Sequence, residues 1–240
     1  MAKDYCTFML RCDIIVRREG IAMAGTTLII SSRNYSSWSL RGYLLVRLSG
    51  LAFDEQVLDP ADPSAREELL LRTSSIRIPC LIHDGFSVWD TLAIAEYLNE
   101  IKPEAGMFPA GRKARARARS IAGEMHSGFH ALRSSLPMNL RAHKPGFAVW
   151  SGAQADIDRV CAIWRECLAE SGGPWLFGAQ RCMADAMYAP VATRFLTYDV
   201  TLDAVCAAYC ARTLALPEMQ DWIAGARREV EEVAELEVEF

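Results

Sequence analysis

The pattern of apolar and polar positions divides the chain into a mixed first part and a helical second part. Residues 26–30 form a short, β-branched apolar run before the polar cluster 31–37, which is typical of a buried strand followed by a functional loop. From residue 38 to 49 apolar side chains recur at helical spacing, and Gly50 supplies a stop signal. We therefore predict a strand, a loop and a helix in that order.

The next segments complete a mixed α/β pattern. Residues 53–58 predict a second strand, and a turn rich in Pro and Asp leads to a short helical stretch around 65–72. Residues 78–82 and 86–89 predict two antiparallel strands joined by a tight turn. A periodic helix then opens at Asp90-Thr91, an acid and a hydroxyl where helix starts favour them. The predicted order is βαβαββα.

The remainder of the chain predicts helices alone. The Pro- and Gly-rich residues 103–112 are interpreted as a linker between an α/β domain, residues 26–102, and an all-α domain, residues 113–240. Residues 1–25 are interpreted as an N-terminal extension outside the fold, with Met23 as the expected natural start. The helices predicted after the linker cover residues 113–140, 153–171, 183–196, 201–214 and 217–233.

Composition narrows the class of ligand. The chain is 51% hydrophobic and 23% charged, and it contains no stretch approaching the roughly 20 apolar residues that cross a bilayer. A net charge of -4 gives no overall attraction for nucleic acid or acidic lipid. We expect a small ligand, and neither nucleic acid nor a membrane as partner.

The cysteines and histidines point to no metal site. None of the 8 cysteines forms a CxxC pair, and residues 1–25 hold no apolar run long enough for a secretory leader, so a reducing cytoplasm fits best. His126 and His130 stand one helical turn apart without a third ligand nearby. We predict no metal.

Three motifs resemble a known family. Residues 77–81, Arg-Ile-Pro-Cys-Leu, are similar to the basic-Val-Pro-x-Leu segment of the glutathione transferases, and residues 88–98 resemble their Glu/Gln/Asp-Ser-x-Ala-Ile-x-x-Tyr-Leu segment. Residues 175–178 followed by 183–186 resemble the entrance to the family's sixth helix, with Cys182 at a position where the family has Ser or Thr. The resemblance covers about residues 26–228. It implies the cytosolic glutathione transferase fold, an α/β thioredoxin-like N-terminal domain plus an all-α C-terminal helical domain.

The resemblance also implies how glutathione binds. Pro79 would be a cis-proline, so that the backbone of Ile78, next to Arg77, pairs with the cysteinyl part of the tripeptide. Thr91 and the helix start are suited to the γ-glutamyl carboxylate, and Asp90 to the α-amino group. Both can also serve simply as helix caps.

The first loop resembles the thiol-activating segment Ser-Ser-Cys-Ser-Trp of the zeta class, the maleylacetoacetate isomerases, and Arg41 matches that class's downstream arginine. The class's principal catalytic serine is replaced here. Ser36, Tyr35 and Asn34 can each donate a hydrogen bond to a thiolate, and Ser36 is our first choice. Ser36 or Ser37 can instead cap the helix. The resemblance further assigns Ser37 and Trp38 to glutathione binding.

The function implied by this resemblance is that of an enzyme, a glutathione transferase. Glutathione would be its co-substrate, activated for attack on a small electrophile in detoxification, and the protein would be a cytoplasmic homodimer. A zeta-like glutathione-dependent cis-trans isomerase, or a non-catalytic glutathione-binding or scaffold protein, are the alternatives. In that family the first helix after the linker borders the electrophile pocket, so the resemblance makes His126, His130 and Arg133 candidates for substrate contact. The sequence does not name the electrophile.

Two charged segments predict no binding function. The basic residues at 112–119 are interpreted as a solvated helix start, because positions two apart on a helix point in nearly opposite directions. The acidic residues from Glu229 to Glu239 are expected to be frayed or exposed.

Overall fold

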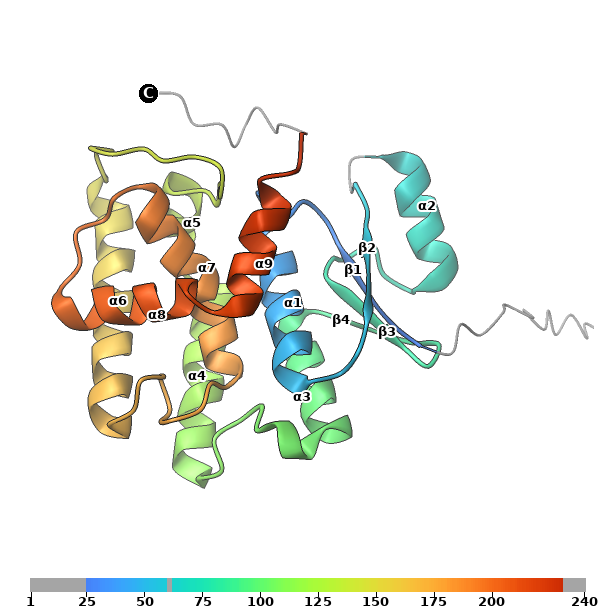
Figure 1. Ribbon diagram of the computed structural model, residues 1–240, viewed down its shortest axis with the longest axis horizontal. Helices are drawn as coiled ribbons and strands as arrows, with labels where there is room; N and C mark the ends of the chain where they lie inside the picture. Colours follow the sequence, from blue (N-terminus) through green and yellow to red (C-terminus); the bar gives the residue numbers. More distant parts are fainter. Residues whose placement is uncertain (1–24, 60–61, 231–240) are drawn as a thin grey trace, which may run out of the picture.

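The computed structural model describes residues 25–59 and 62–230 (Figure 1), so the expected start at Met23 and nearly all of the proposed extension lie outside the described residues. The first elements follow the predicted order βαβαββα. They are β1 (Thr26–Ile30), α1 (Ser37–Ser49), β2 (Asp54–Val57), α2 (Pro63–Arg72), β3 (Cys80–His83), β4 (Phe86–Trp89) and α3 (Thr91–Ile101).

A four-stranded sheet in the order β2-β1-β3-β4 forms the centre of this part. β1 runs parallel to β2 and antiparallel to β3, and β3 pairs antiparallel with β4. Because strand side chains alternate between faces, Leu28 and Ile30 pack into the core with α1 and α3, whereas Ile29 packs with Leu69 of α2. Figure 1 shows α2 on one side of the sheet and α1 and α3 on the other.

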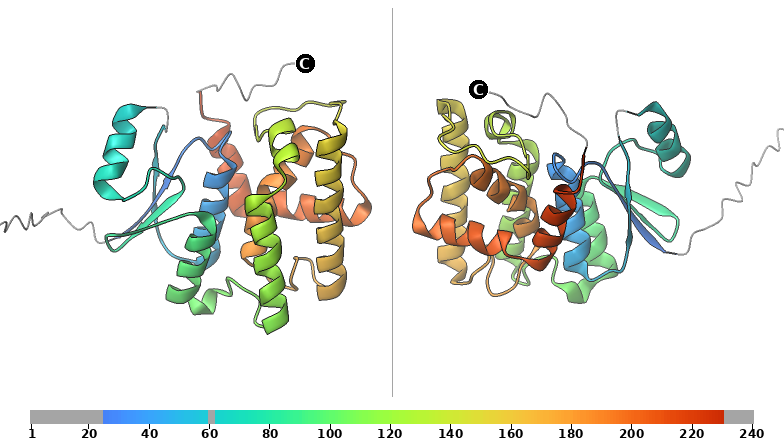
Figure 2. Two further views of the ribbon diagram at one scale, coloured as in Figure 1. Left: turned by 180° about the vertical axis from the view of Figure 1, so that it is seen from behind. Right: turned by 45° about the horizontal axis from the view of Figure 1, so that its top comes forward.

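Helices make up the rest of the described chain, as the sequence predicted. They are η1 (Pro103–Ala105), α4 (Arg112–Ser127), α5 (His130–Ser135), α6 (Ser151–Ser171), α7 (Met183–Thr197), α8 (Ala204–Leu214) and α9 (Pro217–Ala226). Figure 2 shows α4 to α9 gathered on one side of α1, away from the sheet. The exact domain bounds at residues 102 and 113 stay a prediction.

One predicted helix, residues 113–140, is wrong. The chain forms α4 and α5 instead, with a break at Gly128 and Phe129. A β-carbon at Gly128 would lie 2.7 Å from the Glu124 carbonyl oxygen, and Phe129 adopts a left-handed φ of 56°. The chain turns at this point and continues past α5 as an irregular segment, which brings residues 137–141 close to the first loop.

Helix α1 packs against both the mixed α/β part and the helical part of the chain. It contacts α3 on the sheet side and α7 on the helical side, and Leu40, Leu45 and Val46 are fully buried (Figure 1). The first turn of α1 therefore lies where the mixed part meets the helical part.

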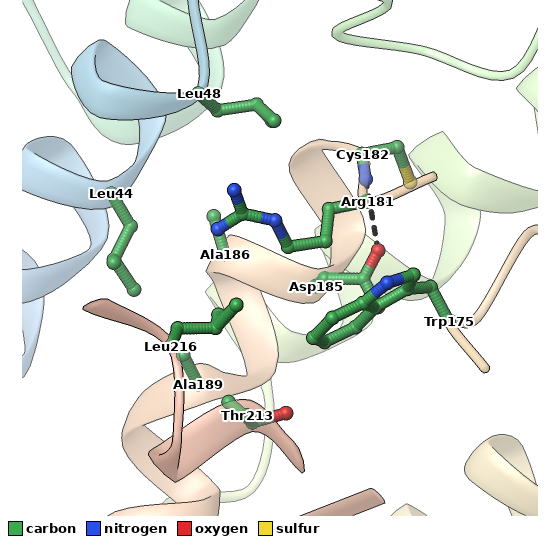
Figure 3. Close-up of a pocket in the computed structure, with 10 residues that line it drawn as sticks. All are labelled: Leu44, Leu48, Trp175, Arg181, Cys182, Asp185, Ala186, Ala189, Thr213 and Leu216. Atoms are coloured by element: carbon green, nitrogen blue, oxygen red, sulfur yellow. Dashed lines mark hydrogen bonds between the residues drawn. The ribbon is translucent and has the colours of Figure 1, made fainter. Parts of the chain in front are cut away.

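The start of α7 is organised around the buried carboxylate of Asp185. It accepts hydrogen bonds from the backbone N–H of Cys182 at 2.9 Å, which Figure 3 shows, from the N–H of Leu176 at 3.1 Å, and from the hydroxyl of Tyr209 at 2.9 Å. Burial raises the pKa of Asp185, and these donors oppose that shift. The void beside it holds only about 20 Å³, room for a single water molecule.

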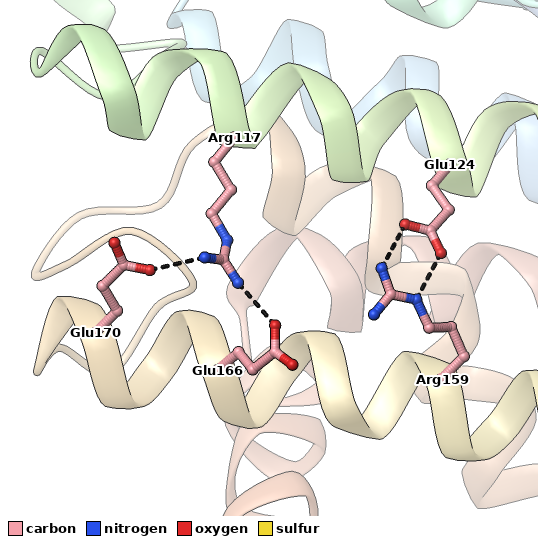
Figure 4. Close-up of polar contacts among 5 residues, drawn as sticks. All are labelled: Arg117, Glu124, Arg159, Glu166 and Glu170. Atoms are coloured by element: carbon pink, nitrogen blue, oxygen red, sulfur yellow. Dashed lines mark hydrogen bonds and ion pairs between the residues drawn. The ribbon is translucent and has the colours of Figure 1, made fainter.

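Arg117 and Arg119 at the basic start of α4 form ion pairs within the protein, and Arg159 of α6 pairs back to α4. Arg117 lies between Glu166 and Glu170 of α6, at 2.8 and 2.9 Å, and Arg159 pairs with Glu124 at 2.7 Å (Figure 4). Exposed pairs of this kind add little stability, but they neutralise the arginines locally. The interpretation as a solvated helix surface rather than a nucleic-acid patch is in keeping with this pairing.

Candidate functional site

Ser36 caps the first helix and also faces a cavity. Its hydroxyl oxygen accepts the backbone N–H of Ser39 at 3.2 Å, and its O–H donates to Ser39 Oγ at 2.9 Å. The side chain is half-buried and forms part of the cavity wall. The capping role weighed for this serine is therefore present, beside an open approach for a ligand.

Tyr35 lies next to Ser36 in the cavity wall. Its hydroxyl oxygen accepts a hydrogen bond from Arg141 Nη2 at 3.0 Å, and the Arg141 guanidinium carbon lies 5.8 Å from the ring centroid. A hydroxyl whose oxygen accepts from a cation donates its own proton more strongly. Tyr35 thus has the chemistry of a thiolate donor.

Asn34 serves a different purpose in the structure. Its side chain is fully buried, Nδ2 donates to Asn139 Oδ1 at 3.0 Å, and Oδ1 accepts the backbone N–H groups of Leu140 and Arg141 at 2.8 and 3.0 Å. The amide therefore ties the first loop to the segment after α5, and Asn34 is not among the residues lining the cavity. This geometry favours Ser36 and Tyr35 over Asn34 as candidate donors.

The cavity has a volume of about 680 Å³. Residues 35–38 form one wall, and side chains that include Arg133, Trp150 and Arg194 form the other. None of the described residues that line it is acidic. His130 and Arg133, weighed as substrate contacts, do lie in this wall.

Trp38 is surrounded by cations and an imidazole. The guanidinium carbons of Arg41 and Arg133 lie 4.7 and 4.8 Å from its ring, and the His126 ring centroid lies 5.0 Å away. Cation–π contacts of this kind favour a fixed indole position. The tryptophan side chain is held where α1, α4 and α5 meet.

Two buried arginines make the surroundings of the cavity strongly positive. Arg41 is fully buried, its Nε donates to the Met187 carbonyl at 2.7 Å, and its Nη2 has no hydrogen-bond partner among the described residues. Burial first, then the charges of Arg194 and Arg133, lower the pKa of Arg41 well below its usual value. The same effects, burial and Arg133, lower the pKa of Arg194 to about 10. An anion in the cavity would offset this repulsion.

Asp90 and Thr91 stand at the start of α3. Asp90 has a left-handed φ of 75°, and its Oδ1 accepts the backbone N–H of Leu92 at 2.8 Å while Oδ2 lies 2.6 Å from His126 Nε2. Thr91 is fully buried, and its hydroxyl has no hydrogen-bond partner among the described residues. The roles predicted for these two residues in holding the γ-glutamyl group stay predictions.

The Ile78–Pro79 peptide bond is cis, as the resemblance implied. Arg77 is exposed, and Ile78 lies just before β3, outside its pairing register. A β-carbon on Gly42 of α1 would come within 2.7 Å of the Pro79 ring, so glycine permits this close approach of helix and loop.

The predicted site residues thus fall into connected groups. Residues 35–38 line the cavity, and His126 links Trp38 to Asp90 through its ring and its nitrogen. Sequence reasoning missed Arg141, Trp150 and Arg194. These residues come from segments more than one hundred positions from the first loop, and no local pattern relates them to it.

Among the described residues there is neither a metal-binding cluster nor a membrane-spanning helix. They contain no group of three or more His, Cys, Asp or Glu side chains arranged to hold a metal ion. No helix among them is long and apolar enough to cross a membrane.

Comparison with known proteins places one part of the chain in a known domain family. Residues 35–101 match the family model for the glutathione S-transferase N-terminal domain. A probable maleylacetoacetate isomerase of Caenorhabditis elegans is 26% identical over 66% of this chain and 73% of its own length. The maleylacetoacetate isomerase of Rattus norvegicus is 25% identical over 71% of this chain and 78% of its own.

Solved structures share the fold. A glutathione transferase homologue from Burkholderia, crystallised with bound glutathione, covers 84% of this chain and 97% of its own, with a TM-score of 0.64 and 24% identity. The Tau class enzyme of mango covers 85% and 96%, with a TM-score of 0.65 and 17% identity. The fold is that of these solved glutathione transferases. Residues 35–101 belong to the glutathione S-transferase N-terminal domain family.

Proposed function

We propose that this protein is a glutathione transferase that favours the thiolate of bound glutathione and directs it at a small electrophile in the cavity. The observation that carries the proposal is the position of residues 35–38, which lie inside the segment matched by the family model and form a wall of the 680 Å³ cavity. Glutathione would lie along Arg77, Ile78, Pro79, Asp90 and Thr91, with its sulfur near Ser36, Tyr35, Ser37 and Trp38.

The start of α1 supports thiolate formation. The positive end of a helix favours an anion, and the nearby cations Arg41, Arg133 and Arg194 act in the same direction. Tyr35 supplies a hydroxyl donor at the same place, and Ser36 supplies a second when its O–H turns from Ser39 Oγ to the sulfur. The proposed reaction is addition of the glutathione sulfur to an electrophilic carbon, with the thiol proton released before attack.

Calorimetric titration with glutathione, followed by conjugation assays at saturating glutathione, tests this proposal. We expect binding in the micromolar to millimolar range and turnover of at least one electrophile. Absence of binding at millimolar glutathione would contradict it. Binding without turnover of any electrophile would favour the non-catalytic glutathione-binding alternative.

A second candidate, glutathione-dependent cis-trans isomerisation, is favoured by the arginines of the cavity. The two relatives compared by sequence are named maleylacetoacetate isomerases, and a substrate of that name carries carboxylate groups. Arg133 and Arg194 stand in a cavity wall without acidic residues, which suits a carboxylate. The test is inhibition by maleate and by its neutral diester. For this candidate we expect maleate to inhibit wild type about tenfold better than Arg133→Gln, and the diester to inhibit both equally.

The proposal extends to assembly and location. Family resemblance supports a homodimer, which light scattering at micromolar concentration tests, a monomer being the contrary result. Six described cysteines are buried free thiols, which fits a reducing cytoplasm. A role in detoxification rests on the family resemblance alone. Cell fractionation with an antibody against the native protein tests the location.

A further inference from the structure

The carboxylate of Glu229 is bound by the loop that carries the thiol-activating residues. It accepts the Ser32 hydroxyl at 2.7 Å and the backbone N–H groups of Arg33 and Asn34 at 2.6 and 3.0 Å. Glu229 was expected to be exposed at the start of an acidic tail, and that expectation is wrong for this residue: its side chain is half-buried and makes three hydrogen bonds. The remaining tail residues from 231 onward lie outside the described residues.

Ser32 passes this contact on to the turn itself. While its O–H donates to Glu229, its oxygen accepts the backbone N–H groups of Asn34 and Tyr35, each at 3.1 Å. The carbonyl of Ser32 accepts the N–H of Ser36 at 3.1 Å. The side-chain rotamer of Ser32 thus holds the backbone conformation from Ser32 to the helix cap at Ser36, and the hydrogen bond to Glu229 fixes that rotamer.

Arg141 carries a second connection from Glu229 to the cavity wall. Its Nη1 donates to the Glu229 backbone carbonyl at 2.5 Å, and its Nη2 donates to the Tyr35 hydroxyl at 3.0 Å. The planar guanidinium of Arg141 therefore connects the backbone at Glu229 to Tyr35, a candidate hydrogen-bond donor to the glutathione thiolate. A rigid fork of this kind fixes the distance between the groups that it joins.

The helix before Glu229 holds the same loop. Trp222 of α9 donates its indole N–H to the Arg33 carbonyl at 2.9 Å, and the Arg33 guanidinium lies 5.0 Å from the Trp222 ring. A β-carbon on Gly225 would come within 2.7 Å of the Arg33 side chain. The contacts of Glu229 thus extend the packing of α9 against the loop at residues 32–34.

We propose that Glu229 is a positioning residue of the thiol site. Its carboxylate fixes the turn 32–34, its carbonyl fixes Tyr35 through Arg141, and together they keep the donors of residues 35–36 directed at the sulfur. This inference rests on the proposed function, since it concerns the activation of glutathione. It assigns a catalytic requirement to a residue 193 positions from Ser36 that touches neither substrate nor cavity.

The Glu229 carboxylate has two opposite effects on the pKa of the bound glutathione thiol. The direction in which that pKa moves in a variant therefore shows which effect dominates. A negative charge near the sulfur disfavours the thiolate, so its removal alone would lower the pKa of bound glutathione. Loss of the fixed turn removes aligned donors, which raises that pKa. Positioning is the dominant effect in our proposal, so the pKa rises.

The experiment follows the ultraviolet absorbance of the bound thiolate across pH in the full chain. Glu229→Gln keeps the size of the side chain but turns an amide toward the two N–H donors. We expect the pH midpoint of thiolate formation in this variant to lie about one unit above that of wild type, a tenfold change in the thiol–thiolate equilibrium. Glu229→Asp keeps the charge, and we expect a midpoint between the two. At saturating glutathione, kcat should fall about tenfold in Glu229→Gln while the KM for glutathione changes less than about threefold.

Glu218→Gln is the matched control. It makes the same substitution in α9 at a buried acid that pairs with Arg181, away from the loop, so it lowers stability without touching the turn. We expect its midpoint to equal that of wild type, and its melting temperature to fall at least as far as that of Glu229→Gln. A chain ending at Val230 should titrate like wild type, and one ending at Arg228 like Glu229→Gln.

The results separate failure of this inference from failure of the proposed function. A wild type that binds glutathione without lowering the thiol pKa would contradict the proposed function itself. A wild type that lowers it, with Glu229→Gln unchanged or shifted downward, overturns the positioning role alone. An equal shift in Glu218→Gln, or in the chain ending at Val230, also overturns it.

Discussion

His126 Nε2 lies 2.6 Å from Asp90 Oδ2, and this contact joins α4 of the helical part to the cap of α3 beside the sheet. Asp90 has a second fixed contact through Oδ1 and the Leu92 N–H. The His126 ring also packs against Trp38 at 5.0 Å. A histidine first weighed as a substrate contact instead positions the aspartate expected to meet the α-amino group of glutathione.

Replacing His126 by Phe should weaken glutathione binding. Phe keeps a ring against Trp38 but cannot donate to Asp90, and loss of a charge-assisted hydrogen bond of about 1 to 2 kcal/mol corresponds to a roughly 5- to 30-fold higher dissociation constant. Calorimetry measures it, with His143→Phe as the control, since His143 lines a separate cavity near α9. Unchanged or tighter binding in His126→Phe would show that the imidazole does not support Asp90.

The hydroxyl of Ser36 should contribute to thiolate formation separately from its cap. Ser36→Ala and Ser36→Gly both remove it, and we expect the pKa of bound glutathione to rise by about one to two units in both variants. Alanine also costs about 1 kcal/mol as a helix cap, whereas glycine costs only a few tenths. Equal thiolate titrations with unequal stabilities would separate the two roles. If Tyr35→Phe shifts upward and neither Ser36 variant does, the donor is Tyr35.

Asn34→Ala should act on stability more than on chemistry. It leaves the Leu140 N–H without its acceptor, while the Arg141 N–H keeps Asn139 Oδ1 at 3.2 Å, at a cost of about 1 to 3 kcal/mol. Urea unfolding measures the loss, which should exceed that of Ser36→Ala. A variant of wild-type stability with a raised thiol pKa would instead make Asn34 the sulfur donor.

Cys182→Ser should stabilise the start of α7. A thiol accepts hydrogen bonds poorly, so restoring a hydroxyl cap is expected to add about 1 kcal/mol to the free energy of unfolding. Burial raises the pKa of the Cys182 thiol well above its usual value, so this side chain is an uncharged group at neutral pH. Thermal unfolding beside a Cys182→Ala control measures the gain. A melting temperature at or below that of wild type means that packing of the sulfur outweighs the cap.

The sequence predicted those parts of the fold that local patterns control. β1 and α1 follow from a β-branched run and a helical period, and the turn at Asp84 and Gly85 follows from its residue types, which adopt φ of 50° and 78°. The break at Gly128 was missed because an isolated glycine is ordinarily tolerated inside a helical pattern at a cost of about 1 kcal/mol.

The site was only partly predictable for a related reason. Residues 35–38 were found because they follow a strand and open a helix. Nothing near Asn34 in the sequence indicates that its amide bonds to residues 139–141, and nothing in an acidic run indicates which glutamate will meet a distant loop. These hydrogen bonds join residues that are at least 105 positions apart, and they produce no periodic pattern in the sequence of either segment.

Because α1 is buried against α3 on one side and α7 on the other, the two halves of this protein are poor candidates for free recombination among relatives. A chimera joined in residues 103–112 would pair one ancestor's α1 with another's α7, where the Arg41 side chain must still reach the Met187 carbonyl. Exchanges that carry α1 and α7 together keep that seam intact. A working chimera of this protein should therefore take α1 and α7 from one parent, although more than one hundred residues separate the two helices.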